Sequence, residues 1–267
     1  MMRSVAALCI PGLVAGGLWL LAGSAPGEEA AAKKVSAVVI VGGHGYDVKD
    51  FPKLFEGYDD IVAAQPSEKE GAALFDNVDG WKYDTIVLYN FSQKLTDKQK
   101  ENFLALLDKG VGLYIMHHAI AAYPDWPEYR EILGARYYLG PVEENGAKHP
   151  ASQWKDDVDY KVHIEDPQHP ITKGMADFEV KDETYNLYDV SPKVHLLLST
   201  DEKTNARTLG WCHLYHKARV CYIQLGHGAK VYVNKDFRRL VAQAIRWTGG
   251  QLPEGDLKPM GTPAAAK

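Results

Sequence analysis

The chain has 267 residues, of which 30 are lysine or arginine and 35 are aspartate or glutamate, giving a formal net charge of −5. Charges of both signs are mixed along the chain. There is no basic stripe of the kind that binds nucleic acid and no basic amphipathic helix of the kind that binds a membrane surface. The composition therefore favours a small neutral molecule as the partner.

The first 25 residues have the order of a secretory signal peptide. A basic start, Met1–Arg3, precedes an apolar stretch from Val5 to Ala22 and the small residues Gly23-Ser24-Ala25. An uncleaved membrane anchor is the alternative, because the apolar stretch approaches the length that spans a bilayer. The glycines within the apolar stretch and the small residues that follow it favour cleavage. We therefore expect a secreted or periplasmic bacterial protein with no stable membrane association after cleavage.

Strands and helices are predicted to alternate up to residue 133. Apolar, β-branched runs predict buried strands at 35–41, 61–64, 84–89 and 112–116. Helices are expected at 51–58, from Thr96 with its capping-box partner Gln99 to Gly110, and through 127–133. This alternation predicts an α/β protein with a doubly wound, mostly parallel sheet that is flanked by helices.

The pattern changes after residue 140. Prolines, tryptophan and alternating polar segments predict a partly antiparallel insertion near the carboxyl ends of the strands. Strands are expected again at 194–199, 207–211 and 219–225, and a last helix begins at Asn234 or Asp236 and ends at Gly249. The domain is thus expected to span residues 33–252 and to be followed by a disordered tail at 253–267.

Two cysteines lie beyond the signal peptide, on the two strands of a predicted hairpin that turns at His216-Lys217. In that register Cys212 and Cys221 face each other across a non-hydrogen-bonded pair, close enough for a disulfide. An oxidising compartment would permit the bond. A disulfide and two buried thiols both remain open.

Two predicted strand ends place a histidine between glycines. Gly42-Gly43-His44-Gly45-Tyr46-Asp47 follows the first strand, and Gly226-His227-Gly228 follows the strand that ends at Leu225. Glycines let a ligand approach the backbone, and the first segment adds a base, a hydroxyl and a carboxylate; a turn with a capping aspartate is the alternative. Neither the dinucleotide fingerprint nor the P-loop spacing is present, so no nucleotide cofactor is expected.

Two further segments carry candidate chemistry. His117-His118 ends the strand at 112–116, at a turn where hydrolases and amidotransferases keep a serine or cysteine. Two imidazoles there favour proton transfer or metal binding, although at least one is expected to be structural. Asp182-Glu183-Thr184-Tyr185 places a carboxylate beside a phenol, which suits acid–base chemistry or sugar binding; a solvated loop is the alternative. Without an H-E-x-x-H or C-x-x-C spacing, a metal site would need distant segments.

Together these residues resemble the ThuA-like (trehalose utilisation) family, within the class I glutamine amidotransferase-like superfamily. The resemblance covers residues 35–252. It rests on the following segments in this order: Gly42-Gly43-His44 with Tyr46-Asp47, Gly110-Val111-Gly112-Leu113, His117-His118-Ala119, Asp125-Trp126-Pro127-Glu128-Tyr129, His169-Pro170-Ile171, Asp182-Glu183-Thr184-Tyr185, Gly210-Trp211, Arg219-Val220 and Leu225-Gly226-His227.

The resemblance implies a flavodoxin-like sheet in which His117 takes the place of a nucleophilic cysteine and His227 lies near the place of the triad histidine. Glutaminase activity is therefore not expected. It also implies a role in the catabolism of trehalose and related glycosides through 3-keto-sugars, with a small carbohydrate as the substrate. Some members bind one divalent metal ion, for which His44, His117 and His227 are the ligands expected in this chain.

The preferred hypothesis is a hydrolase or lyase that acts on a 3-keto-glycoside. A ketone at C3 acidifies the hydrogen at C2, so His117 or His227 would remove it as the base and the C1 substituent would leave. Glu183 would hold or protonate the leaving group together with Tyr185. The residues expected to bind the substrate are His44, Tyr46, Asp47, His118 and Tyr185.

Two alternatives remain. One is a carbohydrate-binding protein without chemistry, in which Trp126, Trp154 and Trp211 would be stacking platforms. The other is an interaction module in an extracellular assembly. Imidazoles at three separate strand ends favour the enzyme, because a sugar-binding protein has little use for titratable groups there.

Overall fold

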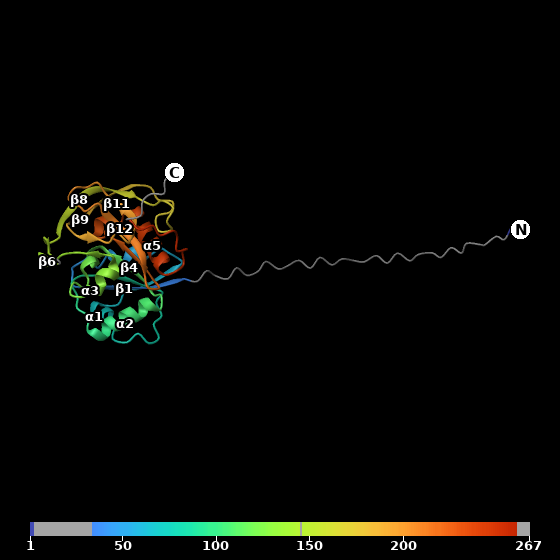
Figure 1. Ribbon diagram of the computed structural model, residues 1–267, viewed down its shortest axis with the longest axis horizontal. Helices are drawn as coiled ribbons and strands as arrows, with labels where there is room; N and C mark the ends of the chain where they lie inside the picture. Colours follow the sequence, from blue (N-terminus) through green and yellow to red (C-terminus); the bar gives the residue numbers. More distant parts are fainter. Residues whose placement is uncertain (3–33, 145, 261–267) are drawn as a thin grey trace. The chain divides into compact units, whose positions relative to one another are not determined.

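The computed structural model describes residues 1–2, 34–144 and 146–260 (Figure 1). The predicted signal peptide at 1–25 lies, apart from its first two residues, outside the described residues. Within the part that the structure describes, no helix is both long and apolar enough to cross a membrane.

A nine-stranded sheet forms the centre of the domain, in the order β2-β1-β3-β4-β13-β12-β11-β8-β9. Its strands are β1 (Val35–Gly42), β2 (Ile61–Ala64), β3 (Thr85–Asn90), β4 (Gly112–Met116), β8 (Gln153–Ile164), β9 (Phe178–Asn186), β11 (His195–Ser199), β12 (Thr208–Tyr215) and β13 (Ala218–Ile223). The first five strands in the spatial order pair in parallel, and every pairing from β13 to β9 is antiparallel. The expected mixed α/β fold around a large sheet is therefore confirmed.

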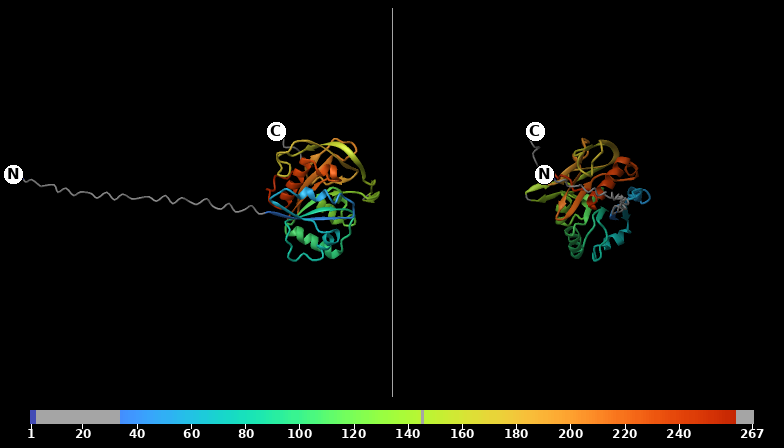
Figure 2. Two further views of the ribbon diagram at one scale, coloured as in Figure 1. Left: turned by 180° about the vertical axis from the view of Figure 1, so that it is seen from behind. Right: turned by 90° about the vertical axis from the view of Figure 1, so that its right-hand side faces the viewer.

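Helices cover both faces of this sheet (Figures 1 and 2). The helical elements are η1 (Phe51–Phe55), α1 (Glu68–Ala73), α2 (Asp97–Asp108), η2 (His117–Ala121), α3 (Pro127–Leu133), α4 (Ala229–Tyr232) and α5 (Lys235–Thr248). Alternate residues of β1 point to opposite faces: Val39 packs in the same core as Phe237 of α5, and Ile40 in the same core as Phe103 of α2. Buried on both faces, the parallel strands are almost continuously apolar, as the sequence indicates.

Helix α2 begins as predicted. The Thr96 side chain accepts a hydrogen bond from the backbone N–H of Gln99, and the Gln99 side chain accepts one from the N–H of Thr96. This reciprocal capping box satisfies two amides that the first helical turn leaves without partners.

The insertion after residue 140 extends the central sheet. Strand β8 pairs with β11, and β9 pairs with β8 at the edge. Two small two-stranded sheets accompany them: β5 (Ala135–Arg136) with β10 (Asp189–Val190), and β6 (Val142–Glu144) with β7 (Ala147–His149). All of these strands pair antiparallel with their neighbours.

The tail after Pro253 is not disordered over its described residues, which corrects the prediction for 253–260. The Trp247 indole donates to the carbonyl of Glu254 at 2.8 Å. The N–H of Lys258 donates to Nδ1 of His195 at 2.8 Å, and Pro259 forms an isolated antiparallel bridge with His195. His195 lies 63 residues before Lys258, so local composition gave no sign of that contact. Residues 261–267 lie outside the described residues.

The hairpin of β12 and β13 turns at His216-Lys217 and pairs Cys212 with Cys221, as predicted. Both cysteines are free thiols and are fully buried. Burial raises the pKa of each thiol, which keeps both protonated and poorly reactive.

Candidate functional site

Three strands of the parallel half of the sheet end at a common edge and bring distant histidines together there. His44 follows β1, His117 and His118 follow β4, and His227 follows β13. Strand β9 adds Glu183 to the same place. Ligands of α/β proteins bind at this carboxyl edge.

All of these side chains except His117 line a cavity of about 460 Å³. Its lining residues are His44, Phe91, His118, Ile120, Tyr137, Tyr138, Leu139, Ser152, Trp154, Asp156, Glu183, Tyr185 and His227. The wall is thus largely aromatic, with a few polar groups that converge at one end. A volume and lining of this kind are typical of a small-molecule site.

His117 occupies a strained turn directly after β4. Its φ is +54°, in the left-handed region that few residues other than glycine adopt. The turn is held from both sides: the ring Nδ1 hydrogen-bonds the carbonyl of Gln224 at 2.7 Å, and the hydroxyl of Tyr222 donates to the carbonyl of His117. Strand-to-helix elbows that carry a nucleophile show the same kind of strain.

Three potential ligand atoms converge in front of this turn. His117 Nε2 lies 3.2 Å from His227 Nδ1 and 3.3 Å from Glu183 Oε2, and the last two atoms are 3.4 Å apart. His117 Nδ1 donates its proton to the Gln224 carbonyl, so Nε2 is the nitrogen that can offer a lone pair to a metal ion in this triangle. Electron-rich atoms at such distances need a proton or a metal ion between them.

The donor set fits a divalent metal ion. Two imidazoles and one carboxylate form the protein ligand set of several zinc enzymes. A tetrahedral ion with ligand distances of about 2.0–2.1 Å separates its ligands by about 3.3–3.4 Å, close to the spacing of this triangle. Among the described residues, His117, Glu183 and His227 are grouped with their ligand atoms within 4.8 Å of one another.

His44, which the sequence suggested as a metal ligand, is not part of this group. Its ring centroid lies 6.2 Å from that of His227 and 4.6 Å from that of His118, on which it stacks. Glu183, expected to act on the leaving group, takes the third position instead. The register of β9 decides this, and it is not visible in the sequence.

Electrostatics fix the protonation of the groups around the triangle. Burial alone would raise the pKa of Glu183, but hydrogen bonds with His117 and His227 outweigh it and hold that pKa well below its usual range. The same hydrogen bond to Glu183 raises the pKa of His227. Burial raises the pKa of Tyr185 far above its usual value, so the phenol stays protonated and donates to His117 Nε2 at 2.9 Å.

Asp182 positions the loop that carries His227. Its carboxylate is buried and accepts hydrogen bonds from the N–H of Gly226 at 2.7 Å and of His227 at 3.0 Å. Gly226 has a φ of +130°, and a Cβ there would lie 3.5 Å from Cβ of His117. A glycine is therefore required where the two histidine turns approach each other.

His118 has a buried nitrogen without a partner. Its Nε2 lies 3.3 Å from the carbonyl of Tyr89, which makes it the N–H, whereas Nδ1 has no hydrogen-bond partner. Burial, with the neighbouring His117 and His44, holds the pKa of His118 well below its usual value, so the ring is neutral. The ring lines the cavity, but this nitrogen is itself buried.

The structure places two of the predicted substrate-binding residues outside the cavity wall. Tyr46 packs edge-on against Phe51 and accepts a hydrogen bond from Gln65. Asp47 accepts from the N–H groups of Lys49 and Asp50, which is the capping role considered as the alternative. Both residues shape the loop that carries His44.

Of the three candidate tryptophans, Trp154 alone is an exposed platform. Its exposed fraction is 65%, and it lines the cavity, whereas Trp126 and Trp211 are buried in the core. Asp156 on the same strand also lines the cavity and was missed, because a lone acidic residue in a polar strand carries no signal. The alternation of Ser152, Trp154 and Asp156 is the one pattern that could have indicated a shared wall.

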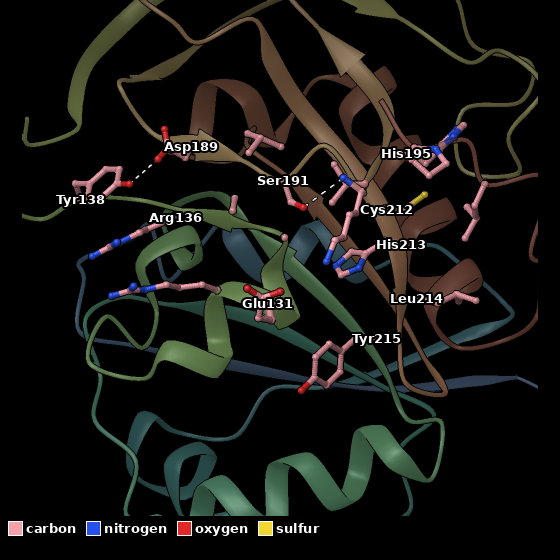
Figure 3. Close-up of a pocket in the computed structure, with 18 of the residues that line it drawn as sticks. Glu131, Arg136, Tyr138, Asp189, Ser191, His195, Cys212, His213, Leu214 and Tyr215 are labelled. Atoms are coloured by element: carbon pink, nitrogen blue, oxygen red, sulfur yellow. Dashed lines mark hydrogen bonds between the residues drawn. The ribbon is translucent and has the colours of Figure 1, made fainter. Parts of the chain in front are cut away.

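A larger cavity, of about 620 Å³, lies elsewhere, beside the β5–β10 pair (Figure 3). Its polar side chains are mostly paired with one another: Tyr138 donates to Asp189, as the dashed line shows, and Arg136 pairs with Glu144. His213 donates to the carbonyl of Ile132. The smaller cavity, with its converging and unpaired nitrogens, is therefore the better candidate for chemistry.

Comparisons with known proteins agree with the fold described above. Residues 60–248 match the model of the ThuA family, described as trehalose utilisation. A ThuA-like protein from Parabacteroides merdae has a similar structure, with a TM-score of 0.68 and 19% identity over 82% of this chain and 91% of that one. One from Bacteroides uniformis has a TM-score of 0.61 and 20% identity over 84% and 95% of the two chains. No curated protein matches. The chain belongs to the ThuA (trehalose utilisation) family.

Proposed function

We propose that this protein is a secreted enzyme of carbohydrate catabolism, a hydrolase or lyase that acts on 3-keto-glycosides. Membership of the trehalose utilisation family supports a role in carbohydrate metabolism. The observation that carries the proposal is the convergence of His117 Nε2, His227 Nδ1 and Glu183 Oε2 at one end of a small-molecule cavity. Neutral hydrogen-bonding groups around it suit a hydroxylated, uncharged substrate.

In this proposal His117, Glu183 and His227 hold one divalent metal ion. When bound, such an ion acts as a Lewis acid that polarises a carbonyl oxygen and thereby acidifies the neighbouring C–H group. The His117 ring is kept in the required tautomer by the carbonyl of Gln224. Partners of this kind on the far ring nitrogen are usual for histidine ligands.

His44 takes the role of the base, which the sequence had suggested for His117 or His227. His117 is fully buried and does not line the cavity, so it cannot reach a substrate. His118 lines the cavity, but its lowered pKa makes it a weak base. His44 is exposed and hydrogen-bonds the carbonyl of Gly45 through Nδ1, which leaves the lone pair of Nε2 free.

The reaction that follows is an elimination. Nε2 of His44 takes the proton from C2, the electrons of that bond form a double bond between C1 and C2, and the bond from C1 to the leaving oxygen breaks. The proton on His44 then passes to this oxygen, so an alcohol is released. The Tyr185 oxygen, whose own proton goes to His117, accepts a hydrogen bond from a hydroxyl group of the ring and holds it in place. Water adds to the double bond afterwards.

A proton NMR time course with a 3-keto-glucoside tests the proposal. The purified mature protein should release the aglycone, and a chelator should suppress the release. His44→Gln should slow the release strongly, whereas His216→Gln, at an exposed surface position, should not. Unchanged turnover in the His44 variant would remove the assigned base, and absence of turnover in the wild type would reject the enzyme.

A carbohydrate-binding protein without turnover is the second candidate. The exposed face of Trp154 on the cavity wall favours it, because aromatic faces stack on sugar rings. Calorimetric binding of a glycoside that remains unchanged on prolonged incubation, and that is unaffected in the His44 variant, would support this candidate.

A further inference from the structure

Strand β8 is irregular where it passes the cavity. Its pairing with β9 shifts register between Lys155 and Val158, and Asp157 has a φ of +63°, which is unusual for a residue other than glycine. Bulges of this kind often lie beside active sites, where they redirect a side chain.

Two lysines hold this bulge in place. The carboxylate of Asp157 pairs with Lys181 of β9 at 3.3 Å and with Lys230 of α4. The left-handed residue is thus tied to the neighbouring strand and to the helix that follows His227. A conformation that an isolated strand would avoid persists because its surroundings determine it.

The bulge directs Asp156 towards His227. Asp156 lines the 460 Å³ cavity and also an adjoining one of about 250 Å³, and His227 lines both as well. Asp156 Oδ1 lies 3.8 Å from His227 Nε2 and accepts the N–H of Asp157 at 2.7 Å. The distance to His227 is within the range of an ion pair and slightly beyond that of a hydrogen bond.

We propose that Asp156 is a positioning residue that fixes the His227 ring from its far side. In the metal-free site Glu183 Oε2, 3.4 Å from Nδ1, favours a proton on Nδ1. With a metal ion in place of that proton, the Asp156 carboxylate next to Nε2 would keep the remaining proton on Nε2 and leave the lone pair of Nδ1 to the ion. Asp156 thereby does for His227 what the Gln224 carbonyl does for His117. The lone pairs of His117 Nε2 and His227 Nδ1 would then point to the same place.

This inference rests on the proposed function only in treating His227 as a working residue of the site. The competing explanation is that Asp156 is a solvated surface carboxylate, since its side chain is 55% exposed. Asp159 provides a matched control. It lies on the same strand, is 77% exposed and pairs with Lys181 at 3.0 Å, and it is not among the residues that line the two cavities.

The test is NMR of the full chain labelled with ¹⁵N in its histidine rings, at one fixed pH, with the ring signals assigned by substitution of each histidine. Wild type with just enough zinc to saturate it should show the His227 proton on Nε2. In Asp156→Asn at the same zinc concentration the His227 signals should move towards those of the metal-free protein, while Asp159→Asn should match wild type. Identical His227 signals in wild type and Asp156→Asn would overturn the inference.

Zinc affinity gives a second readout that does not depend on turnover. Competition with a chelating dye should show a loss of about 10–100-fold in Asp156→Asn, as is usual when the outer partner of a ligand histidine is removed. Asp156→Glu should recover part of it, and Asp159→Asn should not change it. If Asp156→Asn changes the His227 signals and the zinc affinity but wild type shows no turnover, the proposed function is rejected and the inference is upheld. If wild type shows turnover but Asp156→Asn alters neither the His227 signals nor the zinc affinity, the inference is rejected and the proposed function is upheld.

Discussion

Two clusters of histidines in this domain share a similar composition but differ in how their nitrogens are used. In the cavity, His117 and His227 face each other and Glu183. In the second cluster, beneath the tail, His169 and His195 lie with their ring centroids 5.2 Å apart, close to Asp166.

The nitrogens of the second cluster each face a different neighbour. His169 Nδ1 accepts from the N–H of Ile171, and its Nε2 lies 3.5 Å from the Cys212 sulfur. His195 Nδ1 accepts from the N–H of Lys258, and its Nε2 lies 3.1 Å from Asp166, although it makes no hydrogen bond. Burial of a histidine is therefore not a sign of chemistry by itself. What distinguishes the cavity cluster is that His117 Nε2, His227 Nδ1 and Glu183 Oε2 converge on one point.

The largest expected effect distinguishes the carboxylates of the two clusters. Glu183→Gln keeps the shape of the side chain but removes the charge that pairs with both cavity histidines, so turnover of a 3-keto-glucoside should fall by about 10²–10³-fold. Asp166→Asn should leave turnover unchanged and lower only the stability. Equal turnover in wild type and Glu183→Gln would erase the contrast between the clusters.

Acid should weaken the second cluster in particular. Burial, assisted by His195, lowers the pKa of His169 to about 4, against about 6.5 in an unfolded chain. Between these values the unfolded chain binds more protons, so the contribution is complete above pH 6.5 and is lost as the pH falls to 4, up to about 3 kcal/mol. His169→Gln should flatten this part of the stability–pH curve measured by urea unfolding. Parallel curves for the two proteins would contradict the assignment.

Shortening the tail should affect stability alone. A chain that ends after Pro253 loses the Lys258 N–H that satisfies His195 and the Glu254 carbonyl that accepts from Trp247. Leaving buried polar groups without partners costs about 1–3 kcal/mol. The urea midpoint should fall while turnover per folded molecule stays the same; an unchanged midpoint would mean that the tail contacts carry no net stability.

The smallest expected effect concerns the cavity wall. Trp154→Ala should raise KM by roughly 2–10-fold with little change in kcat, the size of one aromatic contact. Val233→Ala, at a residue that is 76% exposed and away from the cavity lining, is the control. A fall in kcat without a change in KM would show that Trp154 acts on the reaction itself.

The sequence predicted those parts of the fold that depend on local signals. The capping box of Thr96 and Gln99 begins α2, the apolar β-branched runs became the parallel strands, and His117, Glu183 and His227 were all singled out before the structure. Residues at strand ends can be found in this way, because parallel strands share one carboxyl edge.

The sequence could not predict what depends on register or on distant partners. Glu183, and not the predicted His44, joins His117 and His227 because of the register in which β9 pairs. Asp156 lies near His227 only because of a bulge in β8 that two lysines stabilise. The order of residues 253–260 likewise depends on His195, some sixty residues earlier. None of these contacts produces a periodic pattern in the amino-acid sequence.

The left-handed turn at His117 has a consequence for how this family diverges. The backbone carbonyl at this turn accepts a hydrogen bond from the Tyr222 phenol whatever the side chain at 117, whereas the Gln224 carbonyl holds the imidazole ring itself. Natural selection can therefore exchange the side chain at this position while the sheet stays as it is. Proteins that descend from one ancestor and keep the same sheet can therefore come to differ in their chemistry through a change in one codon.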